Sequence, residues 1–134
     1  MSSRIRPIFL RKLAARALNH VLRQTGARIV VTSTWREHWT LSENAGALER
    51  DGVLPGCVVG KTCASGGERG AEIDSWLMSV PYPVVSFVIL DDRDDMAVHL
   101  PRLVRIDPQV GLGLPQAQRA IELLGTPWHR KTGP

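Results

Sequence analysis

Aromatic residues and cysteines are scarce in this sequence. Two Phe, one Tyr and four Trp make up its aromatic content. The lone Tyr82 and the lack of aromatics interleaved with basic residues argue against a platform that stacks single-stranded nucleic acid. Cys57 and Cys63 are too few for a zinc site or a disulfide framework. No signal peptide and no apolar run of about eighteen residues is evident, so we expect no membrane partner and a reducing cytoplasm as the compartment.

Long runs of one charge are also missing, which excludes a basic arm or an acidic tail. The 17 Lys and Arg outnumber the 13 Asp and Glu, and the resulting net charge of +4 favours anionic partners. With 134 residues and 43% hydrophobic content, the chain can bury one core. We therefore expect a single domain over residues 1–134, with its core at about 9–124 and a frayed tail at 125–134.

Helical and β-rich segments alternate along the chain. Apolar residues at helical spacing run from Leu10 to Leu22, and Pro115 is well placed to open a last helix. The other expected elements are a strand at 28–31, a helix at 41–50, an irregular or short strand at 53–59, a helix around 72–77, and strands at 84–90 and 103–106. This alternation predicts a three-layer, Rossmann-like α/β fold with a mostly parallel sheet.

Four carboxylates follow the apolar strand expected at 84–90. Asp91, Asp92, Asp94 and Asp95 lie where a parallel sheet gathers its ligands, at the carboxyl end of a strand. Clustered carboxylates repel one another, and a hard cation such as Mg²⁺ neutralises them. A solvated acidic loop is the alternative reading. We expect Asp91, Asp92 and Asp95 to be ligands of weakly bound Mg²⁺ and Asp94 to face solvent.

Hydroxyl groups and a cation accompany this acidic segment in the order that phosphoryl chemistry requires. Thr32 and Ser33 follow the strand at 28–31, and Arg69 opens a later helix. Hydroxyl and backbone N–H groups can hold phosphoryl oxygens, while a cation offsets their charge. We expect Thr32, Thr34 and Arg36 to bind substrate, Arg36 because its planar fork suits phosphate oxygens.

Segments 30–36, 68–77 and 88–92 carry the hydroxyl cluster, the arginine that opens a helix and the acidic pair. Together they resemble the haloacid dehalogenase (HAD) superfamily of phosphohydrolases, and most closely its branch in Swiss Army Knife RNA-repair proteins. The resemblance covers about residues 9–124 and implies Mg²⁺-dependent hydrolysis of a phosphate ester, with an RNA end or a nucleotide as substrate. It also implies a HAD-like fold. By this resemblance the catalytic residues are Ser33 as the phosphate-binding hydroxyl, Arg69 as the cation, and Asp91 and Asp92 as the acidic pair.

The nucleophile motif of that family is missing. The family begins with an apolar strand that ends in Asp-x-Asp, whereas no Asp precedes Asp51 here. A strand over Arg4–Leu10 would be followed by Arg11, a cation at the nucleophile's position. Glu49 stands two residues before Asp51-Gly52, but its surroundings read as helix. We therefore expect little or no turnover from this chain.

The missing motif also affects the expected fold. In the family the first strand is central, and without it the strands at 28–31 and 84–90 would keep unpaired backbone groups, each costing ~1–3 kcal/mol. The sheet therefore apparently lacks its usual first central strand, unless the true start lies upstream, Arg4–Leu10 fills the slot, or a second chain does. Two functions stay open. One is a phosphohydrolase with little activity that binds a phosphorylated small molecule or nucleic-acid end; the other is a non-catalytic phosphate-binding or protein-interaction module. A homo-oligomer is also compatible with both.

Overall fold

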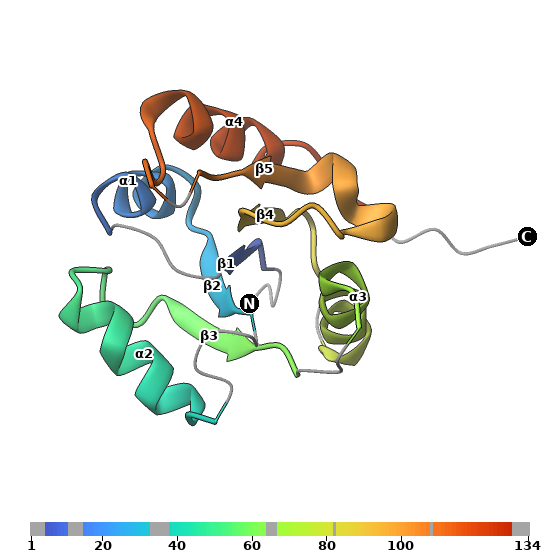
Figure 1. Ribbon diagram of the computed structural model, residues 1–134, viewed down its shortest axis with the longest axis horizontal. Helices are drawn as coiled ribbons and strands as arrows, with labels where there is room; N and C mark the ends of the chain where they lie inside the picture. Colours follow the sequence, from blue (N-terminus) through green and yellow to red (C-terminus); the bar gives the residue numbers. More distant parts are fainter. Residues whose placement is uncertain are drawn as a thin grey trace, which may run out of the picture.

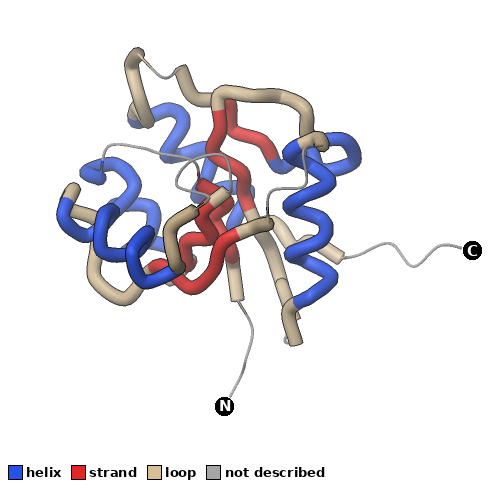
Figure 2. The backbone as a smooth tube through the Cα atoms, turned by 60° about the horizontal axis from the view of Figure 1, so that its bottom comes forward, coloured by secondary structure: helices blue, strands red, loops and turns tan. Residues whose placement is uncertain are grey.

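A five-stranded parallel sheet forms the centre of the computed structural model, which describes residues 5–10, 15–32, 38–63, 67–81, 83–107 and 109–129. The strands lie in the order β3-β2-β1-β4-β5 and have helices on both sides (Figures 1 and 2). The expected α/β fold with a parallel sheet is confirmed. The strands are β1 (Pro7–Leu10), β2 (Arg28–Val31), β3 (Val58–Lys61), β4 (Val88–Asp91) and β5 (Leu103–Arg105). The helices are α1 (Ala15–Thr25), α2 (Leu41–Arg50), α3 (Arg69–Ser79), the 3-10 helix η1 (Ala97–Arg102) and α4 (Leu114–Leu124).

The central strand is present, so the expectation that the sheet lacks it is wrong. Strand β1 pairs in parallel with β2 on one side and with β4 on the other. Its last residue, Leu10, is paired with both Val31 and Leu90. Of the three alternatives raised by the sequence, the segment within Arg4–Leu10 fills the slot. All four residues of β1 are buried, and Pro7 costs the sheet little because it is the strand's first residue.

Side chains alternate between the two faces of the sheet and give the domain two cores. Leu10, Val31 and Leu90 belong to the core beneath α1, α2 and α4. Phe9, Val30 and Ile89, one residue earlier on each strand, belong to the core beneath α3. This period of two is the normal geometry of a strand, and here it makes a three-layer sandwich.

Several element boundaries follow directly from local sequence signals. Thr40 caps α2 through a capping box with Glu43, and the helix covers the predicted residues. Gly26 follows α1 with a φ of 69°, a backbone conformation that favours glycine. Pro115 lies in the first turn of α4, as predicted.

The expected strand at 84–90 is shorter because it contains an extra residue. Ile5 bridges Val84 and Ile8 pairs with Val88, so one strand advances three residues while the other advances four. Such a mismatch marks a β-bulge. The bulge turns the Ser86 hydroxyl toward the end of α4, where it donates to Leu123 O and Thr126 O at 2.8 Å.

The described part of the expected tail, residues 125–129, is packed against the domain. Trp128 donates its backbone N–H to Val85 O at 2.9 Å, and its ring lies 5.0 Å from that of Phe87 in an edge-on contact. Arg102 donates to the carbonyls of Thr126 and Pro127 at 3.0 and 2.8 Å. The prediction of a frayed tail is therefore wrong for 125–129.

Candidate functional site at the carboxyl edge of the sheet

The carboxyl ends of β1, β2 and β4 bring residues distant in sequence to one edge. Leu10 pairs with Val31 and Leu90, so Thr32 and Asp91 lie at the ends of the two strands on either side of β1. In the sequence Leu10 is followed by Arg11, which lies outside the described residues. The strand order reverses between β1 and β4, the type of place where open α/β sheets bind ligands.

Thr32 places a buried hydroxyl at this edge. Thr32 is 0% exposed, and its backbone N–H donates a hydrogen bond to Leu10 O at 2.9 Å. Its Oγ1 makes no hydrogen bond within the part of the chain that the structure describes. By strand alternation Thr32 and Asp91 face α3, because Val31 and Leu90 face the opposite core. A buried unsatisfied hydroxyl costs ~1–3 kcal/mol, so a ligand oxygen here would be favourable.

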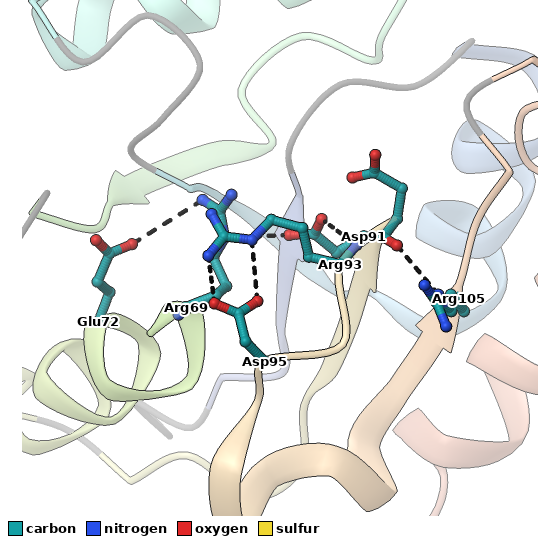
Figure 3. Close-up of polar contacts among 7 residues, drawn as sticks. Arg69, Glu72, Asp91, Arg93, Asp95 and Arg105 are labelled. Carbon is teal, nitrogen blue, oxygen red and sulfur yellow. Dashed lines mark hydrogen bonds and ion pairs between the residues drawn. The ribbon is translucent and has the colours of Figure 1, made fainter. Parts of the chain in front are cut away.

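Arg69 and Asp91 form a buried ion pair across the face covered by α3. The distance from Arg69 Nε to Asp91 Oδ2 is 3.2 Å, and both side chains are 0% exposed (Figure 3). Arg69 Nη1 also lies 4.0 Å from Glu72 Oε1, one turn further along α3. Burial raises the pKa of Asp91, and this outweighs the lowering by the Arg93 N–H and the Arg69 charge. Two residues that the sequence analysis assigned to the site, Arg69 and Asp91, thus lie in contact, while their catalytic roles stay predictions.

Asp95 joins the acidic loop to the start of α3. Its carboxylate accepts the Arg69 backbone N–H at 3.0 Å, and its carbonyl accepts the Gly70 N–H at 2.9 Å. The Arg93 guanidinium donates two hydrogen bonds to the same carboxylate, from Nε to Oδ1 at 2.9 Å and from Nη2 to Oδ2. Burial alone would raise the pKa of Asp95. The hydrogen bonds from the Arg69 N–H and the Arg93 guanidinium lower the pKa by more, so it lies below its ordinary value.

Arg93 was missed by the sequence reasoning although it links two of the predicted site residues. Besides holding Asp95, it donates its backbone N–H to Asp91 Oδ1 at 3.0 Å. The available signal was its place within Asp-Asp-Arg-Asp-Asp, where an arginine can neutralise its neighbours. Its side chain is 40% exposed, so the guanidinium is within reach of solvent.

The outer part of the edge is formed by β5. Arg105 Nε donates to Asp92 O at 3.1 Å, and Arg105 Nη1 lies 3.6 Å from Asp94 Oδ2 with both side chains largely exposed. The predicted solvent-facing Asp94 is indeed exposed. An open cavity of about 480 Å³ lies beside these residues; it is lined by Asp92, Arg105, Ile106, Asp107 and Gln116.

The remaining predicted site residues divide into two groups. Ser33, Thr34 and Arg36 lie outside the described residues. Glu49, the weak alternative for the nucleophile, lies on α2, where its Oε2 accepts the Gly56 N–H at 3.1 Å. It is therefore part of a helix on the β3 side of the sheet and follows no strand end.

The carboxylates in their described arrangement do not fit the predicted Mg²⁺ site. Both oxygens of Asp91 face arginine nitrogens, and both oxygens of Asp95 accept hydrogen bonds from arginine. No group of three or more His, Cys, Asp or Glu that could hold a metal occurs within the described ranges. Mg²⁺ needs near-octahedral oxygen coordination, and these oxygens would first have to leave their present partners.

One family of known proteins matches the chain. The family model described as the HAD domain in Swiss Army Knife RNA repair proteins matches residues 2–117. Neither the curated proteins nor the solved structures gave a significant match. Among the described residues, no helix has the length and apolar character needed to cross a membrane.

Proposed function

This chain belongs to the HAD domain family of Swiss Army Knife RNA repair proteins, and from that premise we propose that it binds a phosphorylated nucleotide or RNA end and hydrolyses the ester slowly or not at all. The observation that carries the proposal is the end of the central strand. Strand β1 ends at Leu10 beside Val31 and Leu90, and the next residue in the sequence is Arg11. A guanidinium cannot attack phosphorus, so no aspartyl-phosphate forms at this position.

Phosphate binding is supported by the groups that surround that strand end. The Thr32 hydroxyl is buried without a hydrogen bond among the described residues. Arg93, on the loop that follows β4, has a side chain that is 40% exposed, and Ser33, Thr34 and Arg36 are proposed as further donors from the segment after β2. Such preorganised donors stabilise phosphoryl oxygens whether or not a nucleophile follows.

In this proposal, dependence on Mg²⁺ is a property of the family's active enzymes. Relatives of the family use Mg²⁺, whereas we propose that this chain binds it only weakly, with Asp91, Asp92 and Asp95 as its nearest oxygen donors. Millimolar affinity corresponds to a binding free energy of about 4 kcal/mol. The cytoplasmic location and a homo-oligomeric state stay predictions.

The test is hydrolysis of p-nitrophenyl phosphate by purified residues 1–134 with MgCl₂. We expect no release of nitrophenol above background, and no change in Asp92→Ala. The double substitution Arg11→Asp with Leu13→Asp restores the Asp-x-Asp spacing, and we expect measurable turnover from it. Thermal denaturation confirms that the double variant folds.

Two results would contradict the proposal. Steady hydrolysis by the unchanged chain that is lost in Asp92→Ala would show that another nucleophile serves the site. A folded double variant without turnover would show that the edge is not a disabled phosphohydrolase site.

A further inference from the structure

Three arginines neutralise the carboxylates at the edge where a metal was expected. We propose that this edge binds phosphate monoesters without Mg²⁺, with Arg69 and Arg93 holding the carboxylates that a divalent cation would otherwise bind. This inference rests on the proposed phosphate-binding function. It adds that arginines, and not a metal ion, balance the charge of the carboxylates at the site.

The pairing of charges is nearly complete along the acidic loop. Asp91 is paired with Arg69, Asp95 with Arg93, and Asp94 with Arg105. The Arg69 pair joins the end of β4 to α3, the Arg105 pair joins the loop to β5, and the Arg93 pair lies within the loop; Figure 3 shows the Arg69 and Arg93 pairs. Three of the loop's four carboxylates therefore have an arginine partner, which reduces the negative charge available to attract a cation.

Burial makes the innermost pair hard to displace. Arg69 and Asp91 have side chains that are 0% exposed, so a metal at Asp91 would have to expel the guanidinium from a site without water. Separating one partner from a buried ion pair leaves an uncompensated buried charge, which is strongly unfavourable. Mg²⁺ also sheds its own water reluctantly, which adds to the barrier.

Independent features of the same edge suit an anion. The Thr32 Oγ1 is buried with no hydrogen-bond partner in the described part of the chain, on the face that Asp91 also occupies. Arg93 uses Nε and Nη2 to hold Asp95, and its Nη1 has no hydrogen bond to another described residue. A hydroxyl and a half-exposed guanidinium are donors that phosphate oxygens can accept from.

The test is calorimetric titration of the whole chain with inorganic phosphate, once in EDTA and once in excess MgCl₂. We expect dissociation constants that agree within about twofold, a difference of ~0.4 kcal/mol. Arg93→Gln should weaken phosphate binding about tenfold in both buffers. Arg119→Gln is the matched control, because Arg119 is an exposed arginine paired with Glu122 on α4, outside this edge.

A second readout requires no phosphate. Titrated with MgCl₂ alone, Arg93→Gln should bind the metal more tightly than the unchanged chain, because Asp95 loses its guanidinium partner. Arg119→Gln should leave the weak affinity for Mg²⁺ unchanged.

The outcomes separate the inference from the function on which it rests. Phosphate binding that appears only with MgCl₂ would overturn the inference and leave the proposed function standing. No phosphate binding in either buffer would overturn the proposed function. Equal binding in the two buffers supports both, and the comparison on the unchanged chain decides the matter even if Arg93→Gln does not fold.

Discussion

Gly70 shows at the scale of one residue how closely the acidic loop approaches α3. A Cβ atom built at Gly70 would lie 2.2 Å from Met96 O, and its next contacts are also backbone atoms of Met96. Met96 is 0% exposed and cannot move outward. Only glycine fits here, and its backbone N–H donates to Asp95 O at 2.9 Å.

Gly70→Ala is therefore expected to lower the free energy of unfolding by ~1–3 kcal/mol through overpacking. Gly46→Ala is the control, because its Cβ would meet only the far end of the Arg50 side chain at 3.3 Å within α2. That change should be neutral or stabilise by ~0.5–1 kcal/mol. Urea denaturation measures both, and a Gly70→Ala protein as stable as the unchanged chain would refute the close contact.

Asp95 gives a pH-dependent prediction at the same scale. Its pKa is lower in the folded state than in the unfolded state, because the Arg69 N–H and the Arg93 guanidinium outweigh the effect of burial. The unfolded state then binds the proton first as pH falls. The stability that Asp95 contributes is present above its unfolded pKa, near 4, and is lost as pH falls through the lower folded value.

Asp95→Asn should therefore be less stable than the unchanged chain at pH 7, and the gap should shrink as the pH is lowered below about 4. Asp94→Asn is the matched control, because Asp94 has an exposed side chain and a longer ion pair of 3.6 Å. Its stability should follow that of the unchanged chain across the range. Urea denaturation in steps of pH tests this, and a gap for Asp95→Asn that persists in acid would contradict it.

Among the elements, η1 is joined to the end of α4 by the side chain of its last residue, Arg102. Arg102 is buried, and its Nη1 donates to Ser86 Oγ at 3.1 Å, Leu123 O at 2.9 Å and Thr126 O at 3.0 Å. Its Nη2 donates to Pro127 O at 2.8 Å. The guanidinium thus joins η1 to the end of α4 and to the segment that follows.

Arg102→Met should lower the free energy of unfolding by about 3 kcal/mol, because the carbonyls of Leu123, Thr126 and Pro127 each lose a hydrogen bond from a charged guanidinium. The shape of the methionine keeps most of the packing, so the loss reports the hydrogen bonds. Arg119→Met on the exposed face of α4 should change stability by less than ~0.5 kcal/mol. Equal denaturation midpoints for the two variants would show that the Arg102 bonds contribute nothing.

The elements also show what the sequence could and could not predict. The helix at 41–50 was predicted with its bounds because its signals are local, including the Thr40 capping box. The sequence leaves strand β1 open because Arg11 follows it where the resemblance implies an acid, and its pairing with two distant strands is not visible in a local pattern. The bulge between Val84 and Val88 could not be predicted, because it arises from packing against the end of α4.

The candidate site was predictable to the same extent. The order of the motifs placed Arg69 and Asp91 together, because parallel strands end at one edge. The pairing of Asp95 with Arg93 depends on the path of the loop after β4, which no spacing rule gives. For this reason the four carboxylates suggested a metal, while their geometry favours arginine partners.

At the scale of the whole molecule, the HAD-like architecture is kept, while the Asp-x-Asp motif that the family resemblance implies is absent. The central strand has both of its parallel neighbours, with buried side chains on either face. Carboxylates, arginines and a buried hydroxyl lie at its carboxyl edge, as the family resemblance led us to expect. Arg11 and Leu13 stand where the Asp-x-Asp motif implied by the family resemblance would have its two acids.

The most direct test of binding without turnover is ³¹P NMR of an RNA oligonucleotide with a terminal phosphate, mixed with the unchanged chain and MgCl₂ and followed over a day. We predict that the resonance of the terminal phosphate broadens or shifts as protein is added, while no inorganic phosphate appears above a protein-free control. Inorganic phosphate accumulating over many equivalents of protein, and failing to accumulate with Asp92→Ala, would contradict the account.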